Sequence, residues 1–454
     1  MNSNSVDLVY LDPPFNSNRN YEAPIGSEAA GAAFKDMWTL DDIDVHEHGE
    51  LADRNPGAYS VIESARQVHG KGMMSYCIFM AVRLLELERI LKDSGSIYLH
   101  CDDAASLWLR ALMDAIFGTN LYQNEITWKR TSAHNDSTSF GRVSDRILFY
   151  GSRINREAVR IVLDENYVRK HYRHRDGNHD RFGPVTLSDL TGPKRSYGES
   201  GETWNGFDPG EAGRCWSVPK TGDYAEWIDH NIIPGYKTMQ GVHERLDALN
   251  SHDMIIWSKN GYPSLKRYLA STKGQIPSDI WTDITGAFGK EKTGYPTQKP
   301  LALLDRIIKA SSNEDDMVFD PFCGCATSLV AADRLQRQWA GIDLSPLAVK
   351  LVNERIIKDR GSLWGKVIVP DQPPTRTDLG KLPNYRTHRH RLYGEQEGIC
   401  VGCDTHFPFR VMEVDHILPR SRGGTDHQDN LQLLCSGCNK SKGSDTMAEW
   451  RARQ

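Results

Sequence analysis

The stretch MVFDPFCGCATSLVAADRLQRQWAGIDLS, residues Met317 to Ser345, decides the fold. An apolar run ends at an acid and is followed by a loop of small residues, a segment with helical periodicity, a second apolar run and a second acid. This order predicts a strand, a tight loop, a helix and a strand, which together form one unit of an α/β sheet. In such sheets a ligand binds at the carboxyl ends of the strands, over the loop that enters the helix.

Two features of this unit indicate a nucleoside-containing cofactor. Gly324 and the small residues beside it let the backbone approach a ligand closely. Asp343, at the end of the second strand, is placed to accept hydrogen bonds from ribose hydroxyls. The loop is not GxGxxG and no lysine follows it as in a phosphate-binding loop, so neither NAD nor ATP is favoured.

Outward from this unit, strands alternate with helices at both ends of the chain. The runs predicted as strands are 6–11, 96–101 and 145–151, and those predicted as helices are 76–92, 105–118 and 301–312. Between about 152 and 290 this periodicity is lost, and so long an irregular stretch in a compact enzyme is usually functional. The pattern predicts an α/β fold with a largely parallel sheet and a long insertion.

Composition narrows the class of protein. With 454 residues, 39% hydrophobic and 25% charged, the chain is too long for one core, and we expect two or three domains. No run approaches the roughly 20 apolar residues of a membrane span, and MNSNSVDLVYLD has no features of a secretory signal, so we expect a cytoplasmic protein with no membrane partner. The net charge of −5 hides a basic segment, 129–200, with fourteen Lys/Arg against nine Asp/Glu. This segment is a candidate for phosphate contacts, although a solvated face explains its charge equally well.

Two short motifs at distant positions resemble one family. DPPF (12–15), the insertion and DPFCGCAT (320–327) follow the order of the beta-type DNA amino-methyltransferases, whose catalytic [D/N/S]PP[Y/F/W] loop precedes the target-recognition region and the FxGxG cofactor loop. YPTQKP (295–300) strengthens the resemblance, which covers roughly residues 5–360. It implies a Rossmann-like methyltransferase sheet, S-adenosylmethionine as cofactor and double-stranded DNA as partner. The cofactor-binding residues that it implies are Asp320, Pro321, Phe322, Gly324, Thr327, Asp343, Gln298 and Lys299.

The chain departs from this family at two places. Position 326 is alanine where the cofactor loop usually has a third glycine. Relatives also carry another strand ahead of the region equivalent to SVDLVYLDPPF, so either the sheet lacks an edge element or the start shown is shortened. Methyltransferases of RNA or protein have related PP-aromatic loops, but they lack this motif order and a tail of the kind present here.

The resemblance explains the chemistry of the catalytic loop, in which it implies that Asp12, Pro13, Pro14 and Phe15 are the catalytic residues. The Asp12 side chain and the Pro13 carbonyl can draw an exocyclic amine out of conjugation and orient its lone pair, while the prolines fix both acceptors. Phe15 offers a flat face for a flipped-out base. Asp rather than Ser at the first position favours adenine N6 over cytosine N4. Taken alone, DPPF is equally well a turn that ends a strand.

In the insertion, basic side chains and tryptophans are candidates for DNA contacts. The basic residues are Arg169, Lys170, Arg173 and Arg175, and the tryptophans include Trp204, Trp216, Trp227 and Trp257. Each tryptophan is more simply explained as part of a small core.

The last seventy or so residues contain two CxxC pairs, Cys400/Cys403 and Cys435/Cys438, separated by 31 residues. This spacing predicts a tetrahedral structural zinc site, which would stabilise a domain too small to fold on its own core. The proline-rich segment before it predicts a linker.

The pattern DH…GG…NL…LC..CN..KG, which runs from Asp415 to Gly443, resembles the HNH (ββα-metal) nucleases. The resemblance implies that His416 takes a proton from water, that Asn430 orients the loop or the histidine, and that Asp415 and Asn439 hold Mg²⁺ or Mn²⁺. One such site cuts one strand, so a homodimer would be needed for simultaneous double-strand cuts. The alternative is a zinc-binding module that only binds DNA.

The predicted organisation therefore has five parts. They are a methyltransferase catalytic half (1–151), a target-recognition region (152–290), a cofactor half (291–367), a linker (368–384) and an HNH nuclease domain (385–454). We predict a site-specific DNA adenine-N6 methyltransferase with a C-terminal endonuclease, as in a restriction-modification, phage or mobile-element system. The alternative is an N6-adenine or N4-cytosine modification enzyme whose tail only binds DNA.

Overall fold

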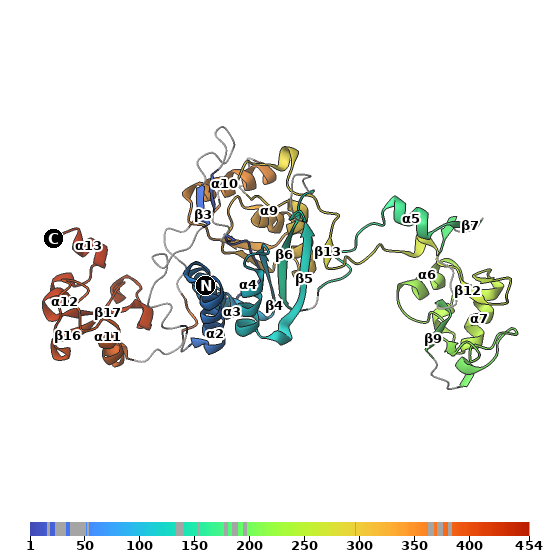
Figure 1. Ribbon diagram of the computed structural model, residues 1–454, viewed down its shortest axis with the longest axis horizontal. Coiled ribbons are helices and arrows are strands. Elements are labelled where there is room, and N and C mark those ends of the chain that lie inside the picture. The colour runs from blue at the N-terminus through green and yellow to red at the C-terminus, as the bar shows by residue number, and fades with distance from the viewer. Residues whose placement is uncertain are drawn as a thin grey trace. The chain divides into compact units, whose positions relative to one another are not determined.

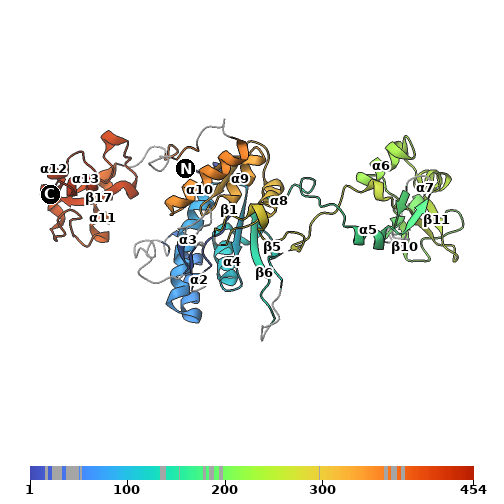
Figure 2. The ribbon, with the colours of Figure 1, turned by 90° about the horizontal axis from the view of Figure 1, so that it is seen from above.

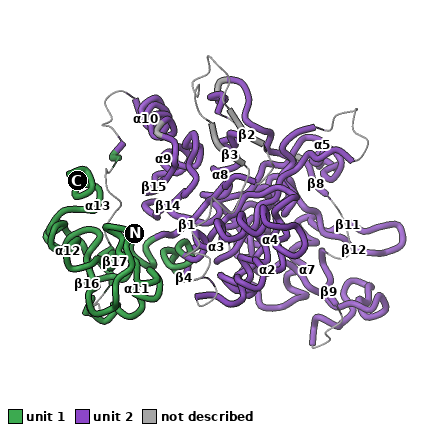
Figure 3. Tube along the Cα trace, turned by 60° about the vertical axis from the view of Figure 1, so that its left-hand side comes forward, with its two compact units in different colours: residues 1–5, 86–92, 368–454 green, residues 6–85, 93–367 purple. Residues whose placement is uncertain are grey.

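The computed structural model describes residues 1–15, 19–22, 33–36, 51, 54–132, 140–152, 154–176, 180–183, 189–193, 198–295, 297–361, 367–369, 376–379 and 384–453 (Figure 1). These residues form two compact units, shown in Figure 3. One unit comprises Val6–Leu85 and Asp93–Val367, and the other comprises Met1–Ser5, Glu86–Lys92 and Ile368–Gln454. Much of the predicted linker, including 370–375 and 380–383, lies outside the described residues.

The larger unit is built on a seven-stranded sheet with the order β13-β5-β6-β4-β1-β14-β15. Its strands are β1 (Val6–Leu11), β4 (Leu91–Cys101), β5 (Tyr122–Lys129), β6 (Ser144–Gly151), β13 (Ile280–Trp281), β14 (Met317–Asp320) and β15 (Gln338–Gly341). β14 is parallel to both β1 and β15, whereas β6 is antiparallel to β4 and β5. The predicted α/β class is confirmed, and β5 is a strand that the sequence pattern did not reveal.

Helices cover both faces of this sheet (Figure 2). They are α2 (Pro56–His69), α3 (Lys71–Ile90), α4 (Ser106–Phe117), α8 (Leu301–Ser311), α9 (Thr327–Arg334) and α10 (Pro346–Arg360). Leu303, Leu304 and Ile307 of α8 pack in one core with Leu8 of β1 and Val318 of β14. β1 and the second half of β4 are buried along their length, which is why these strands read as continuous apolar runs.

The insertion has a hydrophobic core of its own. Its elements are the helices α5 (Glu165–His171), α6 (Asp223–Asn231) and α7 (Val242–Ser251) and the hairpins β7/β8 (His174–Asp176, Asp180–Phe182), β9/β10 (Thr191–Pro193, Arg214–Trp216) and β11/β12 (Ile255–Trp257, Pro263–Leu265). Trp204 and Trp216 lie inside this core with Tyr236, and Trp227 and Trp257 pack against it. The core interpretation of these tryptophans is therefore confirmed. The four basic candidates of this region are exposed.

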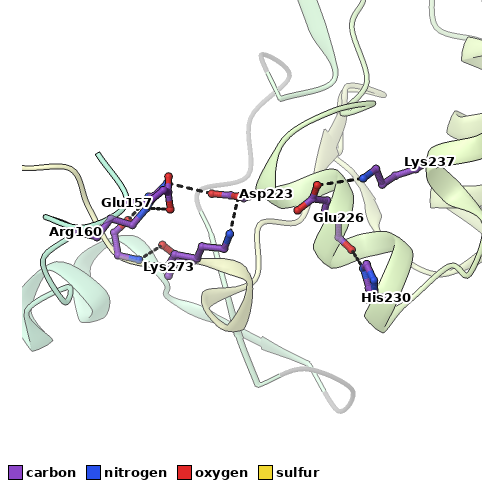
Figure 4. A network of polar contacts seen from close by, with 9 residues as sticks. Glu157, Arg160, Asp223, Glu226, His230, Lys237 and Lys273 are labelled. Atoms are coloured by element: carbon purple, nitrogen blue, oxygen red, sulfur yellow. Dashed lines mark hydrogen bonds and ion pairs between the residues drawn. The ribbon is translucent and has the colours of Figure 1, made fainter. Parts of the chain in front are cut away.

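The two ends of the insertion are held together by a polar network (Figure 4). Ile161 and Gln275 exchange two backbone hydrogen bonds of 2.9 Å. Arg160 and Lys273 both bind the Asp223 carboxylate of α6, at 3.1 and 2.9 Å. We call residues 157–161, 273–275 and Asp223 the neck of the insertion. The neck closes the insertion into a loop whose two ends are adjacent.

The smaller unit contains a ββα arrangement. Its elements are a short 3-10 helix (Tyr385–His388), α11 (Arg389–Glu395), the hairpin β16 (Met412–His416) and β17 (Leu431–Cys435), α12 (Ser436–Lys442) and α13 (Met447–Arg451). Its core is small, with Leu392, Met412, Leu433 and Leu434 packed beside Cys400 and Cys435. Among the described helices of the chain, none combines the length and the hydrophobicity of a transmembrane segment.

Candidate active sites

The two predicted loops of the methyltransferase part leave the same edge of the sheet. β1 and β14 are parallel neighbours with Val9 paired to Phe319, so the residues that follow both strands meet. Burial raises the pKa of Asp320 to about 7, and the charges of Asp12 and Asp343 add to this shift. The expected meeting of the DPPF loop and the glycine loop is confirmed by the strand pairing.

Asp12 is held on one side only. The Lys299 ammonium donates to Asp12 Oδ2 at 2.5 Å, and both side chains are largely buried. Asp12 Oδ1 is also buried, and no donor within the described part of the chain reaches it. An unsatisfied buried acceptor costs about 1–3 kcal/mol, so such atoms are uncommon outside functional sites. Asp12 therefore keeps one acceptor atom for which the described residues supply no donor.

Phe15 rests on a buried histidine that the sequence analysis missed. Its ring stacks on His100 with centroids 5.8 Å apart and planes 17° apart, and the Lys299 ammonium lies 5.2 Å from the Phe15 centroid. His100 is a titratable residue in the largely apolar strand SIYLHC, and this feature of the sequence could have drawn attention to it. The network beneath Phe15 fixes the position of the flat face that the sequence predicted.

The hydrogen bonds of His100 define its protonation. Its Nδ1 lies 3.1 Å from the Tyr10 hydroxyl and its Nε2 lies 3.1 Å from Asp145 Oδ2. Burial raises the pKa of Tyr10, and burial together with the Lys299 charge lowers the pKa of His100. Burial acts to raise the pKa of Asp145, but the hydrogen bond from His100 and nearby positive charges, among them Lys299 and Arg130, together outweigh it, and the net shift is downward. We therefore assign a neutral imidazole that accepts from Tyr10 and donates from Nε2 to Asp145.

The glycine loop is fastened to the end of β15 by Asp343. This carboxylate accepts the backbone N–H of Gly324 at 2.9 Å and that of Ser345 at 2.8 Å. Gly324 has φ +47°, and a Cβ there would lie 3.1 Å from the ring of Tyr295. Ala326 adopts the left-handed conformation that favours glycine, with φ +65°. The loop is thus a narrow cradle with Tyr295 as one wall.

Several residues predicted to bind the cofactor make their contacts within the protein. Asp320 accepts from the Phe322 N–H at 2.9 Å and from the Ser328 hydroxyl. Thr327 Oγ1 accepts from Arg355 at 3.1 Å.

The two predicted residues of YPTQKP also bond internally. Gln298 Oε1 accepts from the Thr293 N–H and hydroxyl, both at 2.8 Å, and its amide donates to the Glu291 carbonyl at 2.8 Å. Lys299 binds the catalytic loop through Asp12. Gln298, Asp320 and Thr327 therefore brace the pocket, and the structure adds a contact with Asp12 to the predicted cofactor role of Lys299. Of the predicted set, Pro321, Phe322 and Gly324 form the loop itself.

The four cysteines of the smaller unit come together as predicted. The Sγ atoms of Cys400, Cys403, Cys435 and Cys438 all lie within 4.8 Å of one another. Burial acts to raise the pKa of the Cys400 thiol, but backbone N–H donors, with that of Cys435 at 3.1 Å, lower it to about 7. Four converging thiol groups with N–H donors fit a structural zinc site.

The predicted HNH residues lie near one another, but their side chains have different partners. His416 Nε2 is 2.8 Å from Asp426 Oδ1, and Arg420 also binds Asp426. Asn430 braces the loop, since its Oδ1 accepts from the Leu418 N–H at 2.8 Å and its Nδ2 donates to the Leu418 carbonyl at 3.0 Å.

The two residues predicted to hold a divalent cation are not presented to one. Asp415 is bound by Gln432 Nε2 at 2.8 Å and by the Lys442 ammonium at 3.0 Å. The Asn439 amide donates to Glu413 Oε2 at 2.6 Å. As they stand, these side chains are not free for Mg²⁺ or Mn²⁺, because the Lys442 ammonium already binds the Asp415 carboxylate. The assignment of Asp415 and Asn439 to a divalent cation stays a prediction.

The sheet order, with the DPPF loop and the glycine loop following neighbouring parallel strands, defines the class as a Rossmann-like methyltransferase fold. Residues 6–354 match the N6/N4 DNA methylase family, and the chain belongs to this family. Residues 400–445 match the HNH endonuclease family, which identifies the smaller unit as an HNH domain.

Curated relatives include restriction-modification proteins. The chain is 32% identical over 294 residues to the type II methyltransferase M.EcaI of Enterobacter cloacae, covering 64% of this chain and 59% of the relative. It is 25% identical over 415 residues to the Mod subunit of the type III enzyme StyLTI of Salmonella typhimurium, covering 85% of this chain and 57% of the relative. The chain thus spans less than two thirds of the length of these relatives.

The solved structures that this chain is similar to include two methyltransferases. The M1.HpyAVI complex with S-adenosylmethionine has 12% identity, covers 78% of this chain and 89% of its own, and gives a TM-score of 0.31. The cytosine-N4-specific PvuII DNA methyltransferase is 12% identical, with a TM-score of 0.33. The match covers 78% of this chain and 80% of that methyltransferase.

Proposed function

We propose that the chain transfers a methyl group from S-adenosylmethionine to the N6 amine of an adenine flipped out of double-stranded DNA. The observation that carries this proposal is Asp12 Oδ1, a buried acceptor that receives no hydrogen bond from the described residues, two prolines before the half-buried Phe15. An exocyclic amine is the donor that this atom is suited to receive, and Asp at this position favours adenine within the family.

The chain's own residues would prepare the amine rather than activate it covalently. Asp12 Oδ1 and the Pro13 carbonyl would each accept one N–H, which turns the nitrogen lone pair away from the ring. Lys299 would hold the second oxygen of Asp12, so that the carboxylate cannot rotate. Phe15, supported by His100, would stack on the base. Alignment of this kind is sufficient for a displacement between two well-positioned groups.

The cofactor would lie over the loop Pro321–Cys325, with Asp343 and Tyr295 beside it. The narrow cradle at Gly324, which a Cβ would fill, suits a flat nucleoside group. When bound, S-adenosylmethionine supplies the methyl group. The insertion 152–290, with its exposed basic residues and separate core, would recognise the DNA sequence.

For the tail we propose zinc at the four cysteines and DNA cleavage supported by Mg²⁺ or Mn²⁺ as its reaction. The match of 400–445 to the HNH family and the Asp426-oriented ring of His416 support this assignment, with His416 as the proton acceptor. The closed state of Asp415 favours the alternative, in which the resting tail only binds DNA. We propose the cytoplasm as the compartment and a homodimer for cutting both strands.

The test compares two variants in one preparation. Asp12→Ala should reduce methyl transfer from labelled S-adenosylmethionine to duplex DNA by about 10²–10³-fold and leave any nicking with Mg²⁺ or Mn²⁺ unchanged. His416→Ala should abolish nicking and leave methyl transfer unchanged. Mass analysis of nucleosides from the modified DNA should give N6-methyladenine, and N4-methylcytosine would replace the proposed base. Unchanged methyl transfer by Asp12→Ala would refute the proposed site.

A further inference from the structure

Lys442, the last residue of α12, is the most deeply buried charged residue of the HNH domain. Its residue exposure is 1%, and that of Asp415 is 8%. Burying an ammonium group is unfavourable by several kcal/mol unless opposite charge and hydrogen bonds compensate it. A lysine on the outer turn of a small domain could reach solvent easily, so its inward position needs a specific partner.

That partner is a set of three oxygen atoms. The Lys442 ammonium lies 3.2 Å from Asp415 Oδ1, 3.0 Å from Asp415 Oδ2 and 3.0 Å from the backbone carbonyl of His416. Three acceptors match the three N–H donors of an ammonium group. Gln432 Nε2 donates to Asp415 Oδ2 at 2.8 Å from the opposite strand, which fixes the carboxylate.

Carboxylate and carbonyl oxygens are also the ligands that a hard divalent cation prefers. The ammonium of Lys442 therefore binds the carboxylate of Asp415, to which the HNH resemblance assigns Mg²⁺ or Mn²⁺. Both cannot bind the same carboxylate face at full strength, because two cations at this distance repel one another.

We infer that Lys442 is a built-in counter-ion that closes the HNH site, so that a divalent cation reaches Asp415 only when the Lys442 ammonium is displaced. The inference concerns the HNH domain alone and rests on the proposed nuclease function only for its biological meaning. DNA offers a natural means of displacement, since a backbone phosphate is an alternative partner for the ammonium. Asp415 would then be accessible to a divalent cation when DNA is bound and inaccessible in the absence of DNA.

The test measures Mn²⁺ binding to the zinc-loaded full-length chain, by the loss of the free Mn²⁺ signal in electron paramagnetic resonance. Lys442→Met should bind one additional Mn²⁺ at least tenfold more tightly than the unmodified chain, and the double variant K442M/D415N should lose that ion. Lys440→Met removes one exposed positive charge from the same helix and should behave like the unmodified chain. Mn²⁺ should also raise the thermal unfolding midpoint of the tail in Lys442→Met and not in the unmodified chain.

A further variant keeps the test decisive if Lys442→Met does not fold. In the unmodified background, Asp415→Asn should leave Mn²⁺ binding unchanged, because Lys442 already excludes the ion. Loss of a tight Mn²⁺ site in Asp415→Asn, or equal Mn²⁺ affinity of Lys442→Met and the unmodified chain, overturns the inference. Nicking of DNA is measured separately: its absence would refute the proposed nuclease while leaving the result on Mn²⁺ binding intact.

Discussion

The methyltransferase pocket and the HNH domain each contain a buried carboxylate paired with a buried lysine, and the two pairs differ in one respect. Lys299 binds one oxygen of Asp12, and the other oxygen is buried and has no donor among the residues that the structure describes. Lys442 and Gln432 together hold both oxygens of Asp415. The same two residue types thus produce a site that is prepared for a ligand and a site that is closed to one.

The difference shows what a paired lysine does in a catalytic site. In the methyltransferase pocket it fixes the orientation of the carboxylate and leaves the reactive atom available. In the HNH domain it satisfies the carboxylate completely, and the domain gains a stable core contact instead. Whether a motif residue is available for chemistry is therefore decided by its partners in the folded chain, and a motif does not state which residues are paired.

The largest expected effect is the unfolding of the HNH domain. Cys403→Ser takes an exposed ligand from the four-cysteine cluster, and structural zinc contributes about 10 kcal/mol or more to the folding of small domains. We expect the tail to unfold and to become sensitive to proteolysis, while methyl transfer stays at its normal rate. Cys215→Ser, a cysteine of the insertion, is the control and should keep zinc. Loss of methyl transfer in Cys403→Ser would mean that the two active sites are not independent.

A smaller effect concerns Asp320, a buried carboxyl group that is braced by Ser328 and the Phe322 backbone. Burial raises its pKa from 3.8 to about 7, so folding favours the protonated form. The contribution of this carboxyl group to the free energy of unfolding is fully present below about pH 4 and is lost as the pH rises through 7. The free energy of unfolding falls by up to about 4 kcal/mol over this range. Asp320→Asn should abolish this loss, so its stability relative to the unmodified chain should increase between pH 4 and pH 7. Denaturant unfolding across this range checks the slope, and parallel curves would contradict the prediction.

The smallest effect tests the pairing of Lys299 with Asp12 in the methyltransferase part. Lys299→Met should lower kcat about tenfold to hundredfold, because Asp12 is then free to rotate away from the amine. The Kd for S-adenosylmethionine should not change, and Lys299→Arg should recover part of the rate. Lys292→Met, an exposed lysine of the same segment, is the matched control. A weaker Kd with an unchanged kcat would instead support the cofactor role that the YPTQKP resemblance implies for Lys299.

Among the strands, the sequence predicted those with continuous apolar runs and missed β5, which lacks one. β1 and β14 were predicted because burial on both sides leaves continuous apolar runs. β5, with the sequence YQNEITWK, is half exposed and contains three consecutive polar residues, so its pattern is weak. The DPPF loop, the glycine loop and the four cysteines were found because each is a local motif.

The partners of these motifs could not be predicted in the same way. Lys299 is 287 residues from Asp12, and their contact depends on the register of α8 and β1 in the folded chain. Lys442 is 27 residues from Asp415 and lies within the quoted HNH resemblance, but nothing in its spacing indicates that it points inward. The identity of catalytic residues is thus local information, and their availability is tertiary information.

The neck of the insertion has a consequence for the evolution and engineering of this protein. Ile161 and Gln275 are joined by two backbone hydrogen bonds, so everything between them enters and leaves at one place. Because its two ends are adjacent, we expect that the segment between Ile161 and Gln275 can be exchanged for one of a different length. The spacing of the sheet strands on either side should not change. Grafting a foreign segment between these two residues would therefore test the proposed role of the insertion, because the DNA specificity should then follow the grafted segment.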